Sequence, residues 1–483
     1  MDISGTNIHV DRQALFNQIL ESDVAGNHIT KYFDNNLYCI YYDNNAYQCS
    51  GIKQDSHGMT IVTGEPIIDL SEGRTRESDA HLIHDSLLNN DLSILKRARG
   101  VFSGININLS SHGIKIFTDK LGIRPIYYYC KDNLLIFSSI LNYFEKLTFL
   151  ELEEDFKGIC ETIAMGFPLS NRTQYKDIKL LQGGDFISIG NNKFTVDSYF
   201  DWSDASSQAK DSADVVSATK KPNSNELSVL SEKLFDVFQD SVKLRLGDEK
   251  VAIAFLSGGL DSRCVTSALK TQIGHLHTFN FGSNRSQDGV FAKLYCEKLG
   301  SKHHEEEASK VPFPNWSELI SNALIKTQLR DELKPVYPQK VWSGDGGSVG
   351  LGFVYLNKEI IDFMNNGDTH KAILTFLSFN KIHLPARFIS NKYKAEAVSL
   401  IYESMINEFN ELKSISAQRR FYLFLMFNDQ QRHLFTHFET IGKHKIELVL
   451  PYFDSDFLSV ILSIPVKYCL GHNFYMEWFK HFP

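Results

Sequence analysis

Short apolar runs separated by turn residues characterise the chain from residue 37 to residue 137. The runs are rich in β-branched and aromatic residues, and Asn-Asn, Ser-His-Gly and Lys-Asp-Asn segments lie between several of them. This pattern is typical of antiparallel strands joined by hairpins. A helix from Leu82 to Leu88 interrupts the strands, which we expect at residues 37–42, 59–63, 104–109, 114–118, 126–129 and 134–137. The first part of the chain is therefore predicted to be an α+β domain.

Long helices alternate with apolar strands in the second part of the chain. Apolar residues recur at helical spacing from Leu227 to Phe238. The continuous apolar run Val251–Phe255 indicates a strand buried on both faces of a parallel sheet. A second strand is expected at residues 277–281, followed by a helix at 287–299, and from Lys371 onward the pattern is mostly helical. Such a βαβ series predicts an α/β domain that binds ligands at the carboxyl ends of its strands.

A polar segment separates these two patterns. Residues 203–225 consist largely of Ser, Ala, Asp and Lys and contain almost no large apolar residues, which is typical of a linker. We therefore predict a first domain at residues 1–202 and a second domain at 226–483. A chain of 483 residues has the length expected for two or three domains.

Composition narrows the class of protein. Lys and Arg total 50 and Asp and Glu total 58, so a net charge of −8 gives no basic field that would attract nucleic acid. The seven cysteines form no C-x-x-C pair, which favours reduced thiols in the cytoplasm. The first residues resemble no secretory signal, and no apolar run is long enough to span a membrane. We expect a cytoplasmic protein without membrane or nucleic-acid partners, for which a homodimer is one option.

The segment Ser257-Gly258-Gly259-Leu260-Asp261-Ser262 follows the first buried strand and leads into a helix. Two glycines let the backbone approach an anion, and a helix amino terminus presents unpaired N–H groups with positive partial charge. Asp261 suits such a cradle if Mg²⁺ lies between its carboxylate and the phosphates. An ordinary helix-capping turn is the simpler alternative. The pattern S-G-G-x-D-S resembles the signature of pyrophosphate-loop ATPases, which adenylate a substrate with ATP and release pyrophosphate.

Further motifs resemble those of the asparagine synthetase family in their order along nearly the whole chain. Residues 256–262 resemble its L-S-G-G-L-D-S motif, residues 343–347 its S-G-[ED]-G-[GS] loop, and residues 447–454 its E-x-x-x-P-F-L-D motif. In the first part, Gly64-Glu65, Ser78-Asp79 and the segment 118–128 resemble the family's glutaminase-type domain. The resemblance implies an αββα sandwich of the Ntn-hydrolase type, followed by a parallel sheet of the adenine-nucleotide α-hydrolase type with a helical C-terminal part.

The resemblance also implies roles for individual residues. The segment 257–262, with Asp261 as the metal ligand, would hold Mg²⁺ and the pyrophosphate of ATP, and Gly282, Ser343 and Gly344 would contribute to nucleotide binding. Asp345 would lie beside the reacting carboxyl group, and Glu447 would orient or deprotonate the attacking amine. Two simpler readings remain open: Asp345 closes a Gly-rich turn, or Glu447 is an ion-paired structural carboxylate.

Other polar residues are expected to be structural. Asp119 and Arg124 lie in the segment that resembles part of the first domain's frame, where a buried ion pair is common. His303 and His304 precede three glutamates, but neighbouring strand residues point to opposite faces, which argues against a metal cluster.

Three features of the sequence depart from the family pattern. Asp2 and Thr63 stand where glutamine-using members have a nucleophilic cysteine and an oxyanion-hole asparagine, so we expect no glutaminase activity. Ser348-Val349 replaces an Asp-Glu pair, which predicts weaker metal binding. Pro483 is the last residue of the sequence, where the family continues into a basic segment with a lysine, so we expect either a further segment or a ligase that lacks this cation.

The function predicted from these patterns is a carbon–nitrogen ligase that forms amide bonds. It would activate a small-molecule or peptide carboxylate as an acyl-adenylate, with ATP and Mg²⁺ as cofactors, for attack by ammonia or another amine donor. Some family branches that form β-lactams or cyclise lasso peptides also lack the cysteine. The alternative is a catalytically weakened pseudo-synthetase that binds nucleotide or protein partners. A tRNA-modifying enzyme is disfavoured because neither a basic patch nor catalytic cysteines are evident.

Overall fold

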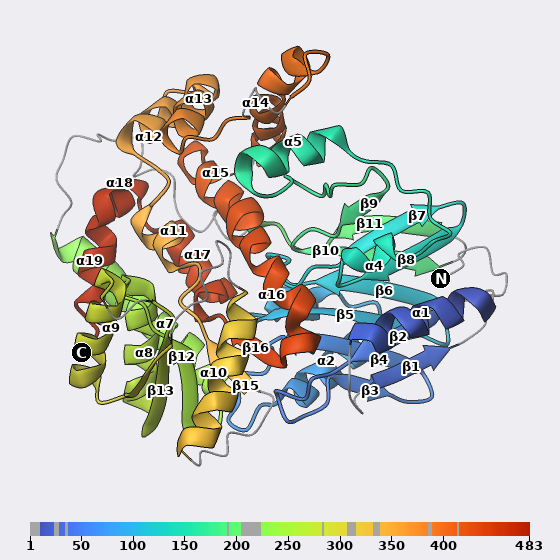
Figure 1. Cartoon of the computed structure of the whole chain (residues 1–483), viewed down its shortest axis with the longest axis horizontal. Helices are drawn as coiled ribbons and strands as arrows, with labels where there is room; N and C mark the ends of the chain where they lie inside the picture. The colour runs from blue at the N-terminus through green and yellow to red at the C-terminus, as the bar shows by residue number, and fades with distance from the viewer. Residues whose placement is uncertain are drawn as a thin grey trace.

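The computed structural model describes residues 10–23, 29–33, 37–190, 193–203, 224–282, 285–306, 315–331, 339–384, 389–412 and 415–483. Antiparallel sheets occupy the first half of the chain, and a parallel sheet with many helices occupies the second. Figure 1 shows the two halves packed side by side, with α16 (Gln431–His444) between them. The mixed α/β class with a parallel sheet in the C-terminal half is confirmed.

A six-stranded antiparallel sheet of order β11-β10-β6-β5-β4-β3 forms the centre of the first half. Ile61 lies in an apolar cluster with a three-stranded sheet of order β8-β7-β9, whereas Val62 packs toward α2 and α3 on the other face. Successive residues face opposite sides because a strand has a two-residue period. The strands are β3 (Ile52–Gln54), β4 (Gly58–Glu65), β5 (Val101–Asn108), β6 (Gly113–Thr118), β7 (Tyr127–Lys131), β8 (Leu134–Ser138), β9 (Ile178–Leu180), β10 (Asp185–Gly190) and β11 (Lys193–Ser198).

The strands predicted in this half are confirmed, including the antiparallel hairpins β5–β6 and β7–β8. The first predicted strand corresponds to β2 (Tyr38–Tyr42), which pairs with β1 (Ile29–Phe33) in a separate two-stranded sheet. The predicted helix is α2, whose first turn is closed by a reciprocal capping box between Thr75 and Ser78. The helices of this half are α1 (Val10–Asp23), α2 (Arg76–Leu88), α3 (Ser93–Arg97), α4 (Asn142–Glu145) and α5 (Phe156–Met165).

The predicted linker falls almost wholly outside the described residues. Residues 204–223 are not described, and α7 (Ser224–Leu246) begins directly after them. The division of the chain at residues 203–225 therefore stays a prediction.

A five-stranded parallel sheet of order β14-β13-β12-β15-β16 organises the second half. The central strand β12 is the predicted apolar run, and it pairs in parallel with β13 on one side and with β15 on the other. Helices α8 and α9 connect the first three strands, as the βαβ pattern predicted. The bounds are β12 (Val251–Phe255), α8 (Leu260–Gln272), β13 (His275–Asn280), α9 (Gln287–Leu299), β14 (Lys302–Glu305), β15 (Gln339–Trp342) and β16 (Ile446–Val449).

Helices make up most of the C-terminal part, as predicted. Figure 1 shows α12 and α13 at the top of the molecule, away from the parallel sheet. The remaining helices are α10 (Trp316–Asp331), α11 (Gly347–Gly352), α12 (Lys358–Asn365), α13 (Thr369–Phe379), α14 (Lys394–Glu411), α15 (Ala417–Phe424), the π-helical turn η3 (Leu425–Gln430), α16, η4 (Pro451–Phe453), α17 (Ser455–Ser463), α18 (Val466–Cys469), η5 (Leu470–His472) and α19 (Asn473–Phe479).

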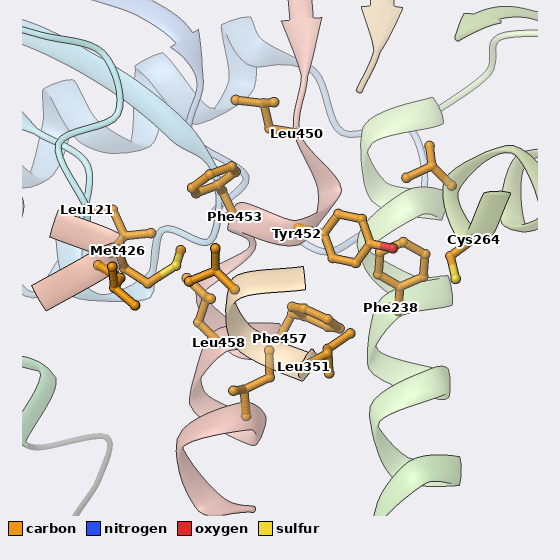
Figure 2. Packing of buried hydrophobic residues seen from close by; sticks show 14 of the residues in the cluster. Leu121, Phe238, Cys264, Leu351, Met426, Leu450, Tyr452, Phe453, Phe457 and Leu458 are labelled. Atoms are coloured by element: carbon orange, nitrogen blue, oxygen red, sulfur yellow. The ribbon is translucent and has the colours of Figure 1, made fainter. Parts of the chain in front are cut away.

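The largest hydrophobic core joins the two halves. Phe238 of α7 contacts the rings of Tyr452 and Phe457, with ring centroids 4.8 and 5.5 Å apart. Figure 2 shows these rings together, and it also shows Leu121 of the first half beside Met426 of the second. Burial of apolar area across this boundary holds the halves in one arrangement.

Buried charges reinforce the boundary between the halves. The carboxylate of Asp454 accepts hydrogen bonds from the guanidinium groups of Arg99, in the first half, and of Arg245, at 3.0 and 2.9 Å. The same carboxylate caps α17 by accepting from the backbone N–H groups of Asp456 and Phe457. Within the part of the chain that the structure describes, no helix is both long and apolar enough to cross a membrane.

Candidate active site

The turn after β12 leaves the amino terminus of α8 without a side-chain cap. Gly259 occupies the N-cap position in extended conformation and supplies no capping side chain. The turn is held from within, because the hydroxyl of Ser257 accepts from the N–H of Gly259 and the hydroxyl of Ser262 accepts from the N–H of Ser257, both at 3.1 Å. The first N–H groups of α8 are thus presented to an anion, at the place that the sequence predicted.

The turn after β15 packs directly against this helix terminus. A Cβ atom on Gly344 would lie 2.7 Å from the backbone nitrogen of Ser262, and one on Gly347 would lie 2.6 Å from a carboxylate oxygen of Asp261. No side chain fits at either position without displacing the neighbouring turn. The backbone N–H of Ser343 donates to the carbonyl of Val449 at 3.0 Å, which ties the same turn to β16.

These two turns flank the point where the order of the strands reverses. From β12 the chain proceeds to β13 and β14 on one side of the sheet, and then returns to β15 and β16 on the other. Ligands of open parallel sheets bind in the crevice at the carboxyl ends of the strands beside such a switch point. The sequence separates Asp261 from Ser343 by a βαβ series, and the sheet brings their turns together.

Asp261 is the centre of the polar contacts at this place. Its carboxylate accepts hydrogen bonds from the backbone N–H of Ser348 at 3.2 Å, from the hydroxyl of Ser348 at 2.6 Å, and from the hydroxyl of Tyr475. Burial raises the pKa of Asp261, these hydrogen bonds oppose the shift, and the negative charge of Asp345 adds to it. The negative charge of Asp345 therefore reaches the carboxylate of Asp261.

This arrangement fits a divalent cation held partly by a nucleotide. Mg²⁺ is commonly bound by one or two carboxylates together with phosphate oxygens and water. Asp261 and Asp345 would supply the carboxylates, and the uncapped terminus of α8 would receive phosphate groups. Among the described residues no cluster of three or more His, Cys, Asp or Glu side chains has the arrangement of a complete protein-only metal site.

Asp345 also makes a local contact. The hydroxyl of Ser343 donates to its carboxylate at 2.5 Å, a bond within the turn itself. This is the contact expected of a residue that closes a Gly-rich turn. The same side chain nevertheless influences Asp261, so both readings of Asp345 stay open.

Gly282 lies just beyond the carboxyl end of β13, on the other side of β12. Its N–H donates to the side-chain carbonyl of Asn280 at 2.9 Å, and Ser286 caps the following helix α9. Residues 283 and 284 lie outside the described part of the chain. The expected contact of Gly282 with adenosine stays a prediction.

Glu447 is directed toward the first half of the protein. Its buried carboxylate pairs with the guanidinium of Arg124, and the hydroxyl of Tyr47 lies 3.5 Å from it. Burial raises the pKa of Glu447, whereas the positive charge of Arg124 opposes the shift. In the register of the sheet Glu447 lies opposite Lys340, three residues before Ser343. The reading of Glu447 as an ion-paired carboxylate is therefore supported by geometry, and its catalytic role stays a prediction.

Two family models match the chain, one in each half. A glutamine amidotransferase domain matches residues 70–200, and an asparagine synthase domain matches residues 233–321, which include the whole turn from Ser257 to Ser262. A putative glutamine-hydrolysing asparagine synthetase of Methanocaldococcus jannaschii is 27% identical over 51% of this chain and 48% of its own length. The chain belongs to the asparagine synthetase family.

Other similarities are more limited. The microcin J25-processing protein McjC of Escherichia coli is 28% identical over 36% of this chain and 30% of its own length. A glutamine phosphoribosylpyrophosphate amidotransferase structure from B. subtilis covers 61% of this chain and 63% of its own, with 10% identity and a TM-score of 0.21, which is too low to carry an argument. The chain spans about half the length, or less, of the curated relatives it matches.

The departure from the family pattern at Ser348 has a structural counterpart. Where the family motif has a carboxylate, Ser348 donates two hydrogen bonds to Asp261. Asp2 lies outside the described residues. Thr63, on β4, bonds to the hydroxyl of Ser103 at 2.9 Å.

The sequence patterns did not predict two residues that lie at this asparagine synthetase-like site. The guanidinium of Arg263 donates to the carbonyls of Gly258 and Gly259 at 3.0 and 3.1 Å, which places a cation beside the turn. Because Arg263 directly follows Ser262 in the sequence, its place beside the turn could have been predicted. Tyr475, from α19 near the end of the sequence, reaches Asp261 from 214 positions away, and no local pattern marks it.

Asp119 and the two neighbouring histidines make contacts within their own halves, whereas Arg124 pairs across the halves with Glu447 and not with Asp119. Asp119 accepts from the backbone N–H groups of Phe102, Leu121 and Ile123. His304 contacts His277 at 3.1 Å, whereas His303 contacts the thiol of Cys296 at 3.2 Å, so the two histidines face opposite sides of β14.

Proposed function

We propose that the protein is an ATP-dependent carbon–nitrogen ligase that forms amide bonds. It would activate a substrate carboxylate as an acyl-adenylate, release pyrophosphate, and transfer the acyl group to ammonia or another amine. Membership of the asparagine synthetase family supports this reaction class, and the similarity to asparagine synthetases favours an enzyme over a non-catalytic nucleotide- or partner-binding protein. The carboxylate would come from a small molecule or a peptide.

One observation carries the proposal: the uncapped terminus of α8 lies beside Asp261 at the switch point of the parallel sheet. Pyrophosphate needs N–H donors and neutralisation of charge, and this place offers both. Arg263 would keep the loop carbonyls turned away from the phosphates, because it binds the carbonyls of Gly258 and Gly259.

The remaining residues have roles that follow from their positions. Mg²⁺, held by Asp261 with the help of Asp345, would neutralise phosphate charge when bound. The carboxyl group of the substrate would attack the α-phosphorus near Asp345, and the phosphorus–oxygen bond to pyrophosphate would break. Glu447, held by Arg124, would orient the amine, which then displaces AMP from the acyl carbon.

The first half would supply the frame for this chemistry. We infer that its six-stranded and three-stranded sheets, with α2 and α3 on one outer face, form the αββα sandwich of Ntn hydrolases. The domain boundary would lie at residues 203–225, as predicted.

The test is exchange of radiolabelled pyrophosphate into ATP, measured with a panel of amino acids, sugar acids and peptide carboxylates. We expect exchange that depends on Mg²⁺ and on one class of carboxylate. Asp261→Ala should abolish exchange, and Asp248→Asn is the control, because Asp248 is exposed just before the other end of β12. Absence of exchange with every acid, together with no rise in melting temperature on addition of Mg²⁺ and ATP, would contradict the proposal.

A further inference from the structure

A cavity of about 640 Å³ lies mostly in the first half of the protein and reaches α16 and Glu447 of the second half. It runs alongside β7, because Arg124, before the start of this strand, and Asn133, after its end, both line it. The residues near Asn133 are exposed, whereas Arg124 is buried. We call the part of the cavity lined by the exposed β7–β8 turn its outer end and the part lined by the buried Arg124 its inner end.

Apolar side chains form the walls between these two ends. Ile61, Ile105 and Ile116 come from neighbouring strands of the six-stranded sheet, and Leu135 comes from β8 on the facing sheet. Each of these side chains is at most 5% exposed. The volume is within the range of about 300–1,000 Å³ that small-molecule sites occupy.

The inner end carries hydrogen-bond donors that have no acceptor among the described residues. These donors are the side-chain Nδ2 of Asn44, the Nε of Arg76 and the Nε of Arg124. The three residues line the cavity and are only 5, 3 and 7% exposed. An unsatisfied buried donor costs about 1–3 kcal/mol, so three of them at one end of a cavity favour a bound acceptor.

The charges at this end are already balanced. Arg76 pairs with Asp43 at 2.6 Å, and Arg124 pairs with Glu447. The guanidinium groups are also fixed from one side, since Arg76 stacks on Tyr47 and Arg124 on Phe438, at 4.8 and 4.7 Å from the ring centroids. An anionic ligand would add an unbalanced negative charge, whereas an uncharged oxygen would accept the free N–H groups at no such cost.

We propose that this cavity is a binding site for an uncharged ligand with an apolar body and a terminal carbonyl or carboxamide oxygen. The oxygen accepts hydrogen bonds from the donors at the inner end, and the apolar body lies between Ile105 and Leu135. The site uses neither the turn at Ser257 nor the residues around Asp261, but Arg124 and Glu447 line its inner end, so in this respect the proposal rests on the proposed function. Binding at this site is independent of ATP.

The test compares three probes that share an apolar tail and differ at the end group: octanamide, octanoate and octylamine. Isothermal titration with the full chain, without ATP, is expected to show that octanamide binds about ten-fold more tightly than the other two probes. This difference in affinity corresponds to the free energy gained when a buried donor finds an uncharged acceptor. Equal affinity for all three probes, tighter binding of octanoate or of octylamine, or no binding of octanamide would each overturn the proposal.

Variants then locate the site. Ile105→Phe should weaken octanamide binding at least ten-fold, because the larger side chain extends into the cavity. Ile107→Val is the control, since Ile107 belongs to the same strand and apolar cluster but does not line the cavity. If Ile105→Phe does not fold, Ile116→Phe replaces it, because Ile116 lies opposite Ile105 in the sheet and also lines the cavity.

A third variant tests the donors. Asn44→Leu keeps the size of the side chain and removes the free N–H group. It should reduce the preference for octanamide over octanoate, with circular dichroism as a check of folding. Unchanged binding of octanamide by a folded cavity-filling variant would overturn the location, and an unchanged preference in Asn44→Leu would overturn the role of the donors.

Discussion

Arg124 and Glu447 form a buried ion pair between residues that are 323 positions apart in the chain. Arg124 belongs to the segment that precedes β7, and Glu447 belongs to the edge strand of the parallel sheet. The pair therefore joins the glutamine amidotransferase-like half to the synthetase-like half at the carboxylate that we propose to orient the amine.

Removal of Arg124 should destabilise the protein strongly. Arg124→Met leaves Glu447 buried without its cation, and the expected loss is about 3–5 kcal/mol in the free energy of unfolding, measured with urea. The double variant Arg124→Met with Glu447→Gln should recover part of this loss, because no buried charge remains. Lys131→Met is the control, since Lys131 forms an exposed pair with Asp177 at 3.6 Å. A loss of stability no larger in Arg124→Met than in this control would contradict the prediction that Glu447 is left as an unpaired buried charge.

A carboxylate at position 348 should strengthen the binding of Mg²⁺. Ser348→Asp places a second acid beside Asp261, so repulsion should lower the melting temperature without metal, and added Mg²⁺ should raise it more than in the wild type. An increase in Mg²⁺ affinity of about ten-fold is expected from the added charge. Ser348→Asn is the control of matched size without charge. If both variants respond to Mg²⁺ alike, Asp261 does not hold the metal.

Asp454 should contribute to stability through charge. Burial acts to raise the pKa of Asp454, but the charges of Arg245 and Arg99 outweigh it, so the pKa is lowered in the folded protein. Its contribution is therefore fully present above the ordinary pKa of about 3.9 and is lost as the pH falls through the lower folded value.

Asp454→Asn retains a good helix cap but leaves two arginines without their carboxylate. The expected loss is about 3 kcal/mol at pH 7, measured by urea unfolding, and the difference from the wild type should shrink below about pH 4. Asp456→Asn is the control, since its side chain is 54% exposed while it contacts the same Arg99. This exposed partner should cost no more than about 1 kcal/mol. Equal losses in both variants would show that burial does not decide the effect.

His437 should make stability depend on pH in a different range. Burial lowers the pKa of His437 to about 3, and the positive charges of Arg124 and His444 add to the shift. The unfolded chain binds a proton near pH 6.5 that the folded protein does not, so stability falls as the pH drops from about 6.5 toward 3.

Replacement by Gln should remove this dependence. The wild type should lose up to about 1.4 kcal/mol per pH unit relative to His437→Gln in this range, as measured by urea unfolding at several pH values. His57→Gln is the control, because His57 is exposed. Parallel stability curves for the wild type and His437→Gln between pH 4 and pH 6.5 would contradict the prediction.

Local patterns in the sequence determined the elements and the class of the fold. The run Val251–Phe255 predicted a buried parallel strand, and the two glycines and Asp261 that follow predicted a turn for phosphate, because strand period, helix termini and glycine act over a few neighbouring residues. The antiparallel hairpins of the first half were readable for the same reason.

Only the tertiary structure decided which distant residues meet. The hydroxyl of Tyr475 on Asp261, the packing of Gly344 on Ser262 and the pair of Arg124 with Glu447 depend on how helices and sheets pack. No local pattern specifies such contacts, because each joins segments whose separation is set by the whole core. The cavity along β7 is likewise a property of two facing sheets, and neither sheet reveals it in its own sequence.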